Sequence, residues 1–360
     1  MAQRSNRTRP GVRALNIGEI ARRAGVSRST VSYALSGKRP LSQATRRRIH
    51  EVIDELGYRP NAHARALKEG RTRTIGLVIP PAGARLTDMQ VDFVAGIVDA
   101  AARADLDVLI SSSGGDHDRS FERVITGGRV DGVVLMEVLM QDPRVDRLQR
   151  TGLPFVTIGR TGYTDGVCSV DIDHVALTAR CVHHLADLGH RHIALINRPT
   201  HLVAAGYGCA RRSQDGFEAA VAERGLSSVE LCCADDPAAG EACIEELLAA
   251  HSRVTAVVAV NEAALAGIGR ALARAGLVVP RDFSITGVAA RYWAEELDPP
   301  LTGAEFPAAE LCAQAITLLM ERISEPDKPS RTVLLAPPIY LRGSTGPVSS
   351  RRRSRRRNPS

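Results

Sequence analysis

Polar and basic side chains with the spacing of one helix face occur near the N-terminus of this 360-residue sequence. They are Arg28, Ser29, Ser32 and Tyr33. Arginine can donate two hydrogen bonds to guanine in the DNA major groove, and hydroxyl groups bind phosphate oxygens or base edges. The other face of the same segment is apolar and consists of Val31, Ala34 and Leu35. The pattern predicts a short helix with one buried face and one face suited to nucleic acid.

A helix before this segment is predicted from apolar residues at helical spacing, which are Ile17, Ile20, Ala21 and Ala24. Asn16 stands at its N-cap position, Gly25 allows a tight turn after it, and Ser27 can cap the next helix. Two short helices joined by a glycine turn form a helix-turn-helix, whose second helix can enter the major groove. An ordinary helical hairpin is the alternative, because A-G-V-S alone is a weak string.

A third helix is predicted to begin after Ser42 and to end near Leu56, with Ile49, Val52 and Ile53 on its apolar stripe. Its exposed side carries three consecutive arginines, Arg46 to Arg48. Basic and hydroxyl side chains bind DNA phosphates, and such contacts set affinity rather than sequence preference. Candidates for contact with the DNA backbone are Ser27, Ser32, Arg46 and Arg47. Residues 15–57 therefore form a predicted DNA-binding module.

Composition supports a polyanionic partner and excludes several classes of site. The net charge is +7, and basic residues concentrate in the first 75 positions and in the C-terminal R-R-R-S-R-R-R run. No apolar run reaches transmembrane length, and the N-terminus does not have the pattern of a secretory signal. Seven cysteines without C-x-x-C favour buried free thiols over a disulfide framework or a zinc site. Residues His183, His184, His190 and His192 are interpreted as solvated residues at a helix end, not as metal ligands.

The chain beyond the module changes to alternating strands and helices. Residues 1–14 are interpreted as a disordered basic arm, 58–72 as a linker, and 73–342 as an α/β core. Expected strands are 75–79, 108–111, 132–135, 154–158, 193–196, 256–260 and 283–286; expected helices include 89–104, 175–188, 212–224, 239–250 and 262–275. Such alternation implies parallel sheets covered by helices on both faces, divided here into two doubly wound lobes. Ligands of such folds bind beyond the carboxyl ends of the strands.

These segments resemble the lactose/galactose-repressor family of bacterial transcription regulators. The resemblance rests on A-G-V-S-R-S-T-V-S, on L-G-Y-R-P-N-A-H-A-R-A-L, on I-G-L-V-I-P, and on L-G-H-R-H-I-A-L-I, D-P-P-L-T and L-R-G-S-T, in that order. It implies a core like that of periplasmic sugar-binding proteins, with three crossings between lobes. The expected lobes are 74–188 with 303–325 and 189–301 with 330–342, followed by a disordered basic tail over 343–360.

The resemblance also implies a function. We expect a cytoplasmic homodimer that acts as a repressor on near-palindromic double-stranded operator DNA, without a cofactor or metal. A small-molecule effector would modulate it from the cleft between the lobes. Arg28 and Ser29 occupy the family's main base-reading positions, and Tyr33 stands where many members have an arginine that reads a base. In the linker, the resemblance assigns minor-groove contacts to Asn61, Arg65, Leu67 and Lys68, with Leu67 as the wedge that kinks the duplex.

The expected effector cleft departs from the family pattern. Its positions are Pro80, Met136, His174, Arg212, Ser213, Asn261, Ala289 and Phe306. Ala289 stands in place of a hydroxyl-binding aspartate, and Met136 and Phe306 replace commonly polar groups. Each buried hydroxyl without a partner costs about 1–3 kcal/mol. We therefore predict weak or absent binding of neutral monosaccharides, and a smaller, partly apolar or acidic effector, if there is one.

Two other classes of protein could use the same α/β core. An enzyme is disfavoured because the sequence lacks G-x-G-x-x-G after the first strand, G-x-x-x-x-G-K-S/T and G-x-S-x-G. A secreted solute-binding protein would need an export signal and would not need residues 15–72. We accordingly predict a regulator and not an enzyme.

Overall fold

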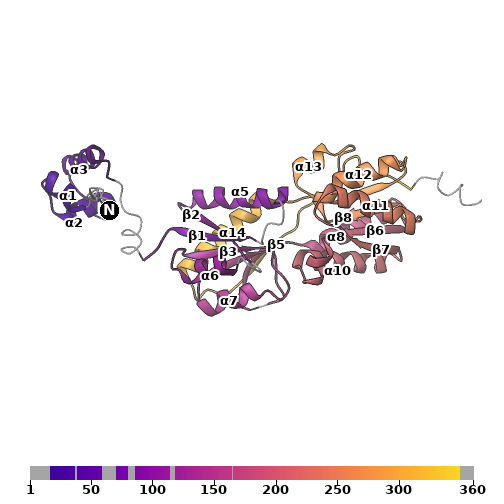
Figure 1. The fold of residues 1–360 in the computed structure, drawn as a ribbon, viewed down its shortest axis with the longest axis horizontal. Coiled ribbons are helices and arrows are strands. Elements are labelled where there is room, and N and C mark those ends of the chain that lie inside the picture. The colour runs from indigo at the N-terminus through magenta and orange to yellow at the C-terminus, as the bar shows by residue number, and fades with distance from the viewer. Residues whose placement is uncertain are drawn as a thin grey trace, which may run out of the picture. The chain divides into compact units, whose positions relative to one another are not determined.

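The computed structural model describes residues 17–36, 39–58, 70–79, 86–113, 118–163 and 165–348. It divides after Thr72 into two compact units, an N-terminal unit and a core that begins at Arg73. Figure 1 shows the helices and strands of both units with the labels used below.

The described residues of the N-terminal unit form three helices, α1 (Ile17–Arg23), α2 (Arg28–Ser36) and α3 (Gln43–Leu56). Ile20, Val31 and Ile49, one from each helix, have no solvent exposure and form the centre of its core. Gly25 has a positive φ of 63°, a conformation that glycine adopts without strain. The predicted helix-turn-helix and third helix are therefore confirmed, whereas Asn16 lies outside the described residues.

The core contains two six-stranded sheets, which define its two lobes. The first sheet has the order β11-β5-β4-β3-β1-β2, with β1 (Thr74–Ile79), β2 (Asp107–Ser112), β3 (Gly132–Met136), β4 (Phe155–Ile158), β5 (Cys168–Ile172) and β11 (Thr332–Leu335). The second has the order β12-β10-β9-β8-β6-β7, with β6 (His192–Asn197), β7 (Ser227–Cys232), β8 (Ala256–Ala259), β9 (Ser284–Ala289), β10 (Thr302–Glu305) and β12 (Ile339–Tyr340). All named strand pairs are parallel except β10 with β12.

Helices cover both faces of each sheet, which explains why central strands such as β3 and β8 are buried along their whole length. The helices of the first lobe are α5 (Asp88–Arg103), α6 (Asp118–Thr126), α7 (Pro143–Thr151) and α14 (Ala308–Ser324). In β3, Val134 and Met136 lie on the face of the sheet that α5 and α14 cover. Val133 and Leu135 lie on the opposite face, which α6 and α7 cover. Figure 1 shows α5 and α7 on opposite sides of this sheet.

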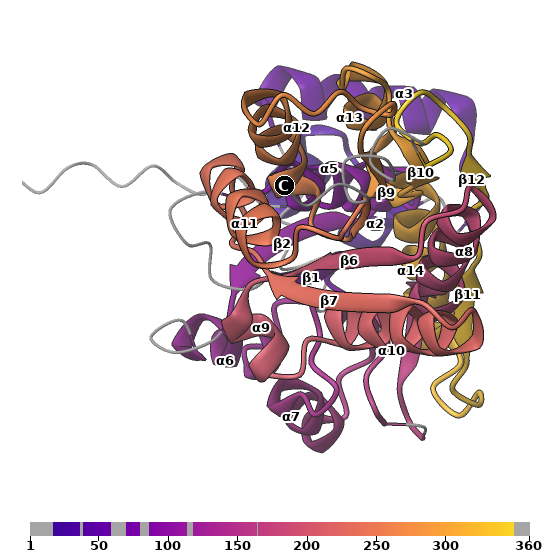
Figure 2. The same cartoon turned by 90° about the vertical axis from the view of Figure 1, so that its right-hand side faces the viewer.

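The second lobe repeats this arrangement. Its helices are α8 (His174–Asp187), α9 (Thr200–Ala204), α10 (Gly208–Glu223), α11 (Pro237–Ala250), the 3-10 helix η2 (Glu262–Ala264), α12 (Leu265–Arg274) and α13 (Arg291–Glu296). In β6, Ala194 and Ile196 pack with α11 and α12, and Ile193 and Leu195 with α8 and α10. Figure 2 shows α11 and α12 above β6 and β7, and α10 below them.

The lobe boundaries differ from the expected ones at three places. Helix α8 packs on α10 and on the second sheet, so residues 174–188 belong to the second lobe, not to the first. Strand β10 pairs with β9 in the second sheet, and β11 pairs with β5 in the first. The chain crosses after β5, after β10 and after β11, which gives the expected three crossings. The exchange of β10 and β11 between sheets depends on long-range pairing that no local pattern encodes.

The segment 343–348 is packed against the second lobe, in contrast to the expected disordered tail. Ser344 accepts a hydrogen bond from the Thr302 amide at 2.8 Å, and the Val348 amide donates to the Leu188 carbonyl at 3.2 Å. His190 is only 2% exposed and lies 3.1 Å from the Gly346 carbonyl oxygen and 2.8 Å from the Thr255 hydroxyl. Burial lowers the pKa of His190 to about 4. His190 is therefore a buried neutral anchor, and its interpretation as a solvated residue was wrong.

Candidate functional site

The start of α2 presents hydroxyl and guanidinium groups at the surface of the N-terminal unit. The Ser27 side chain accepts a hydrogen bond from the Thr30 amide at 3.1 Å and thus caps the helix. Its oxygen also lies 2.6 Å from the Ser29 hydroxyl and 2.8 Å from the Thr30 hydroxyl. Ser27 is therefore held in place by local contacts, and Ser29 is exposed beside it.

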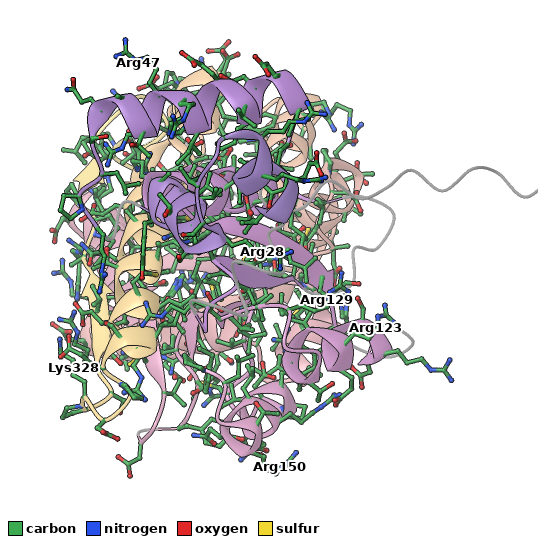
Figure 3. All side chains as sticks on the ribbon, turned by 90° about the vertical axis from the view of Figure 1, so that its left-hand side faces the viewer. Arg28, Arg47, Arg123, Arg129, Arg150 and Lys328 are labelled. Atoms are coloured by element: carbon green, nitrogen blue, oxygen red, sulfur yellow. The ribbon has the colours of Figure 1, made fainter. Side chains whose placement is uncertain are left out.

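Arg28 is exposed at the first position of α2, and its guanidinium group lies over Gly18 in α1. A Cβ atom at Gly18 would lie 2.7 Å from Arg28 Nη2, so the glycine leaves the space that this side chain occupies. Figure 3 shows Arg28 and Arg47 on different sides of the N-terminal unit, with Arg47 directed outward from α3. Arg46 and Arg47 are both exposed. Arg28 can therefore contact the major groove while Arg47 contacts a phosphate from a different surface of the unit.

Tyr33 is half-buried on α2, next to the exposed Arg39. The Arg39 guanidinium carbon lies 5.2 Å from the centre of the Tyr33 ring, within range of a cation–π contact. Sequence reasoning did not select Arg39, although a basic residue shortly after the recognition helix is a detectable signal. Ser32, also named as a phosphate contact, is half-buried on the same helix.

The core has a cavity at its lobe junction, lined by residues from both lobes. The wall is apolar over most of its area, with contributions from Met89, Phe93, Met136, Val138, Ile158, Val260, Val288 and Phe306. It leaves about 60 Å³ for the centre of a water-sized sphere. The ring of Phe306 packs edge-on against Phe93 at 5.3 Å between ring centres.

Polar groups enter this cavity from the ends of strands. Glu137 directly follows β3, and its carboxylate accepts a hydrogen bond from the Gln90 side chain at 2.6 Å. Arg198 directly follows β6, donates to Asp235 at 3.1 Å, and lies 5.4 Å from the centre of the Tyr207 ring. Although burial opposes the charge of Arg198, Tyr207, Asp235 and Glu137 raise its pKa, so it stays a cation.

A second polar group in the cavity runs from Asp171 through His174 to Cys209. His174 Nε2 lies 3.5 Å from Asp171 Oδ1, and His174 Nδ1 lies 3.5 Å from Cys209 Sγ. Asp171 also accepts hydrogen bonds from Arg160 Nε at 3.1 Å and from the Arg160 amide at 3.2 Å. Burial opposes protonation of His174, but Cys209 and Asp171 outweigh it and raise the pKa of His174 to about 10. At neutral pH the histidine is therefore a buried cation.

Comparisons with known proteins agree with both parts of this geometry. Residues 16–61 match the pattern of bacterial regulatory proteins of the lacI family, and residues 182–345 match a periplasmic binding protein-like domain. The chain is 32% identical over 347 residues to the HTH-type transcriptional regulator AglR of Rhizobium meliloti, covering 94% of this chain and 96% of that protein. It is 30% identical to the ribose operon repressor of Escherichia coli K12, covering 91% and 98%.

This chain belongs to the lacI family of bacterial regulatory proteins. As a lacI-family member it is a DNA-binding transcriptional regulator, and its relatives are regulators and not enzymes. A solved regulator CelR–cellobiose complex is similar, with a TM-score of 0.68, 28% identity and coverage of 92% of this chain and 99% of that one. The lac repressor dimer bound to operator has the same fold, with a TM-score of 0.81, 22% identity and coverage of 93% and 100%.

For this lacI-family chain, the structure places the expected cleft residues in two groups. Met136, His174 and Phe306 line the cavity. The remaining described positions are not among the residues that line it: Arg212, Ser213, Asn261 and Ala289. Arg212 donates to the carbonyls of Arg160 and Thr161, at 2.7 and 2.9 Å, and Asn261 donates to the carbonyl of Cys233 at 2.8 Å. These side chains are occupied by backbone groups, and Ser213 and Ala289 are fully buried.

Sequence reasoning missed Glu137, Arg198, Tyr207 and Cys209, all of which line the cavity. Glu137 and Arg198 directly follow predicted parallel strands, where ligand-binding side chains collect, so strand ends were a usable signal. The hinge positions Asn61, Arg65, Leu67 and Lys68, and the cleft position Pro80, lie outside the described residues. Their roles stay predictions.

Two negative findings apply to the described part of the chain. None of its helices has the length and apolar character that a membrane crossing requires. Nor do its histidine, cysteine and acidic side chains gather into a group that could hold a metal ion. All seven cysteines are free thiols, five of them buried, as the sequence predicted.

Proposed function

We propose that the chain is a repressor that binds a near-palindromic operator as a cytoplasmic homodimer, and that a small ligand in the cavity modulates this binding. The observation that carries the proposal is the exposed start of α2, where Arg28 and Ser29 stand on a helix capped by Ser27 and supported by a packed three-helix core. Two such helices, one per subunit, fit two major-groove half-sites about one helical turn apart.

Exposed apolar side chains on the first lobe support the homodimer. Val91 and Val98 of α5 are 49% and 43% exposed, and Ile110 of β2 is 48% exposed. Large apolar residues collected on neighbouring elements are typical of protein interfaces. A subunit contact through this lobe would hold two N-terminal units on one DNA molecule, and a variant with Val91 and Val98 both changed to aspartate is expected to sediment as a monomer.

The cavity supports a small ligand with one polar end and an apolar body. Arg198 and His174 supply positive charges, whereas Met136, Val260 and Phe306 offer no hydrogen-bonding side chain. Arg198 takes the role for which the sequence suggested Arg212 and Asn261, because those two side chains bind backbone carbonyls instead. A sugar ring would need a partner for each buried hydroxyl, which Met136, Val260 and Phe306 do not supply.

The regulator proposal is tested by mapping the bound sites of the native protein across its genome and measuring affinity for the recovered sequences by fluorescence anisotropy. We expect two inverted half-sites, a complex with two chains per site, and release by a member of a panel of organic acids and small carbonyl compounds. Sites without inverted symmetry would contradict the dimer. Release by cellobiose or a neutral monosaccharide alone would contradict the proposed ligand class.

The linker is tested separately with Leu67→Ala. We expect lower operator affinity and a smaller DNA bend, because an apolar wedge that unstacks a base step is removed. Affinity for scrambled DNA should stay nearly the same, since phosphate contacts are kept. An unchanged bend angle in a gel-shift bending assay would contradict the wedge.

A further inference from the structure

Cys209 is the single cysteine among the described residues that line the cavity, and it differs from the other six in its surroundings. It is partly accessible, whereas Cys168, Cys181, Cys233, Cys243 and Cys312 are buried and Cys232 is exposed. Reactive cysteines are typically partly exposed and next to positive charge, while buried structural cysteines are inert. Cys209 combines access from a cavity with an adjacent cation.

The cation beside Cys209 is His174, whose ring is fixed from its far side. Asp171 Oδ1 lies 3.5 Å from His174 Nε2, and the Ile172 amide donates to the same carboxylate at 2.9 Å. Arg160 holds the other oxygen of Asp171. His174 Nδ1 therefore faces Cys209 Sγ, and Cys209 together with Asp171 raises the pKa of the ring against the opposing effect of burial. The Asp171 carboxylate thus contacts one ring nitrogen of His174, and the other ring nitrogen contacts the Cys209 sulfur.

Two further features place positive potential beside the Cys209 sulfur. Cys209 is the second residue of α10, a 16-residue helix, and the N-terminal end of a helix carries a partial positive charge. Arg198 is a second cation of the same cavity, and it interacts electrostatically with Cys209. The thiolate is the nucleophilic form of cysteine. A histidine, an arginine and a helix N-terminus thus surround one sulfur.

We propose that Cys209 is a covalent sensing site for small α,β-unsaturated carbonyl compounds that enter the cavity. The sulfur attacks the β-carbon, a C–S bond forms, the C=C π bond breaks, and its electrons pass to the carbonyl as an enolate. His174 Nδ1 donates a proton to the enolate and recovers one from water, matching the proton that the thiol lost. The product is a thioether, and the addition requires neither an oxidant nor a leaving group.

The walls favour a carbon electrophile over a peroxide. Met136, Val260 and Phe306 suit a short carbon chain. Oxidation of Cys209 would be expected to use a second thiol for its reversal, and the cavity lining among the described residues contains no other cysteine. Addition of an unsaturated carbonyl compound needs one thiol and one proton donor, both of which are present.

An adduct would act at the lobe junction. Asp171 belongs to the first lobe, and His174 and Cys209 belong to the second. A group attached to Cys209 occupies the space between them. It shifts the equilibrium between two lobe arrangements when the adduct is more stable in one arrangement than in the other. This consequence for DNA binding rests on the proposed function, whereas the chemistry at Cys209 does not.

The chemistry is tested on the full-length protein with acrolein as the probe, by intact mass and by peptide mapping over time between pH 6 and pH 8. Cys232, an exposed thiol of the same chain, is the internal control. We expect the first adduct at Cys209, on the order of tenfold faster than at Cys232 at pH 6, with a rate at Cys209 that depends less on pH than the rate at Cys232. First reaction at Cys232, or equal pH dependence at the two cysteines, would overturn the proposal.

Variants separate the role of His174 from a structural one. His174→Asn cannot carry the charge, and we expect the Cys209 rate to fall on the order of tenfold and to become pH-dependent, with the Cys232 rate unchanged. Cys209→Ser should abolish the fast adduct, and Cys232→Ser should keep it. Faster modification of Cys209 by hydrogen peroxide than by acrolein at equal concentration would assign the site to oxidants and overturn the proposed ligand class.

Operator binding is measured on the same samples. Loss of operator affinity in step with the Cys209 adduct, absent in Cys209→Ser, supports both proposals. An adduct that leaves operator affinity unchanged overturns the sensing role while the chemistry stands. A protein that binds its operator but forms no fast adduct overturns this inference and leaves the proposed function intact.

Discussion

The N-terminal unit and the cavity of the core display their functional side chains in opposite ways. Ser29, Arg28 and Arg47 are exposed on helices whose apolar faces are packed beneath them. In the cavity, Asp171 and His174 are buried and bound to each other. The first kind of site keeps its side chains available for a large partner, whereas the second pre-orders them for a small one.

The difference has energetic consequences. An exposed side chain costs little when it is removed, so its loss is measured in binding and not in stability. A buried charge that loses its partner destabilises the fold strongly, because the remaining charge stays out of water. Substitutions in the two regions should therefore separate cleanly into effects on unfolding and effects on DNA binding.

The largest effect is expected for Asp171→Ala, which removes the shared partner of His174 and Arg160. We expect the free energy of unfolding to fall by roughly 3–5 kcal/mol, as for other broken buried pairs. The matched control is Asp187→Ala, an exposed carboxylate paired with Arg224, for which about 0–1 kcal/mol is expected. Urea unfolding at pH 7 measures both, and equal decreases would contradict the distinction between the two regions.

The ion pair also has a defined pH window. The pKa of Asp171 is lowered, chiefly by His174 and Arg160 against the opposing effect of burial, so its stabilisation is present above its unfolded pKa and is lost in acid. The pKa of His174 is raised to about 10, so its contribution is complete below pH 6.5 and is lost as the pH rises through about 10. The destabilisation by Asp171→Ala should therefore be smaller near pH 10 than near pH 6.

The second effect concerns Glu262, a buried carboxylate that accepts a hydrogen bond from the Ala290 amide. Burial, together with Asp92 and Asp88 of α5, raises the pKa of Glu262 to about 7. A raised acid pKa means that the folded state binds the proton more tightly, so stability falls as the pH rises from about 4.5 to about 7. The shift corresponds to roughly 3 kcal/mol at most.

Glu262→Gln removes this charge and keeps an oxygen that can accept from Ala290. We expect the variant to gain stability relative to wild type at pH 8 and to lose that advantage at pH 4.5. Glu246→Gln, an exposed carboxylate on α11 of the same lobe, is the control and should change neither value by more than about 0.5 kcal/mol. Parallel pH profiles for wild type and Glu262→Gln would show that Glu262 does not titrate in this range.

Arg28→Ala should act on DNA binding and not on folding. The guanidinium group is exposed at the surface of the unit, outside its apolar core, so the melting temperature should stay within about 1–2 °C. Operator affinity should fall by roughly 1–3 kcal/mol for each bidentate base pairing that the variant cannot make. Arg22→Ala, an exposed arginine of α1 paired with Glu19, is the control. Anisotropy titrations measure the affinity for operator and for scrambled DNA. An equal loss of affinity on both would show that Arg28 does not read a base.

The sequence predicted the N-terminal unit well because its signals are local. Helical periodicity, the capping serines and Gly25 all lie within residues 17–56 and agree with one another. Strands β1, β2, β3, β4, β6 and β8 were predicted for the same reason, whereas β5 and β7 were missed. Strands β10, β11 and β12 and the placement of α8 were not predicted, because their partners lie far away in the sequence and each could pair with either sheet.

The cavity was only partly predictable for a related reason. His174 and Phe306 could be placed by motif, but whether Arg212 reaches the cavity depends on the carbonyls of Arg160 and Thr161, which lie in a different lobe. Arg198 faces the cavity because Asp235 and Tyr207 hold it there. When several side chains compete for backbone acceptors, the sequence does not tell which of them reaches the cavity. Exposed side chains face no such competition.

The smallest effect is expected for Arg47→Ala, which tests whether the outward face of α3 contributes charge alone. We expect the same modest decrease in affinity on operator and scrambled DNA, and a salt dependence whose slope decreases by about 0.9 for each phosphate that the variant no longer neutralises. Arg253→Ala, an exposed arginine of the second lobe, changes the net charge equally and is the control for overall charge. If Arg47→Ala weakened operator binding alone, Arg47 would belong with Arg28 among the base-reading residues. If it matched Arg253→Ala at every salt concentration, α3 would contribute no phosphate contact through Arg47.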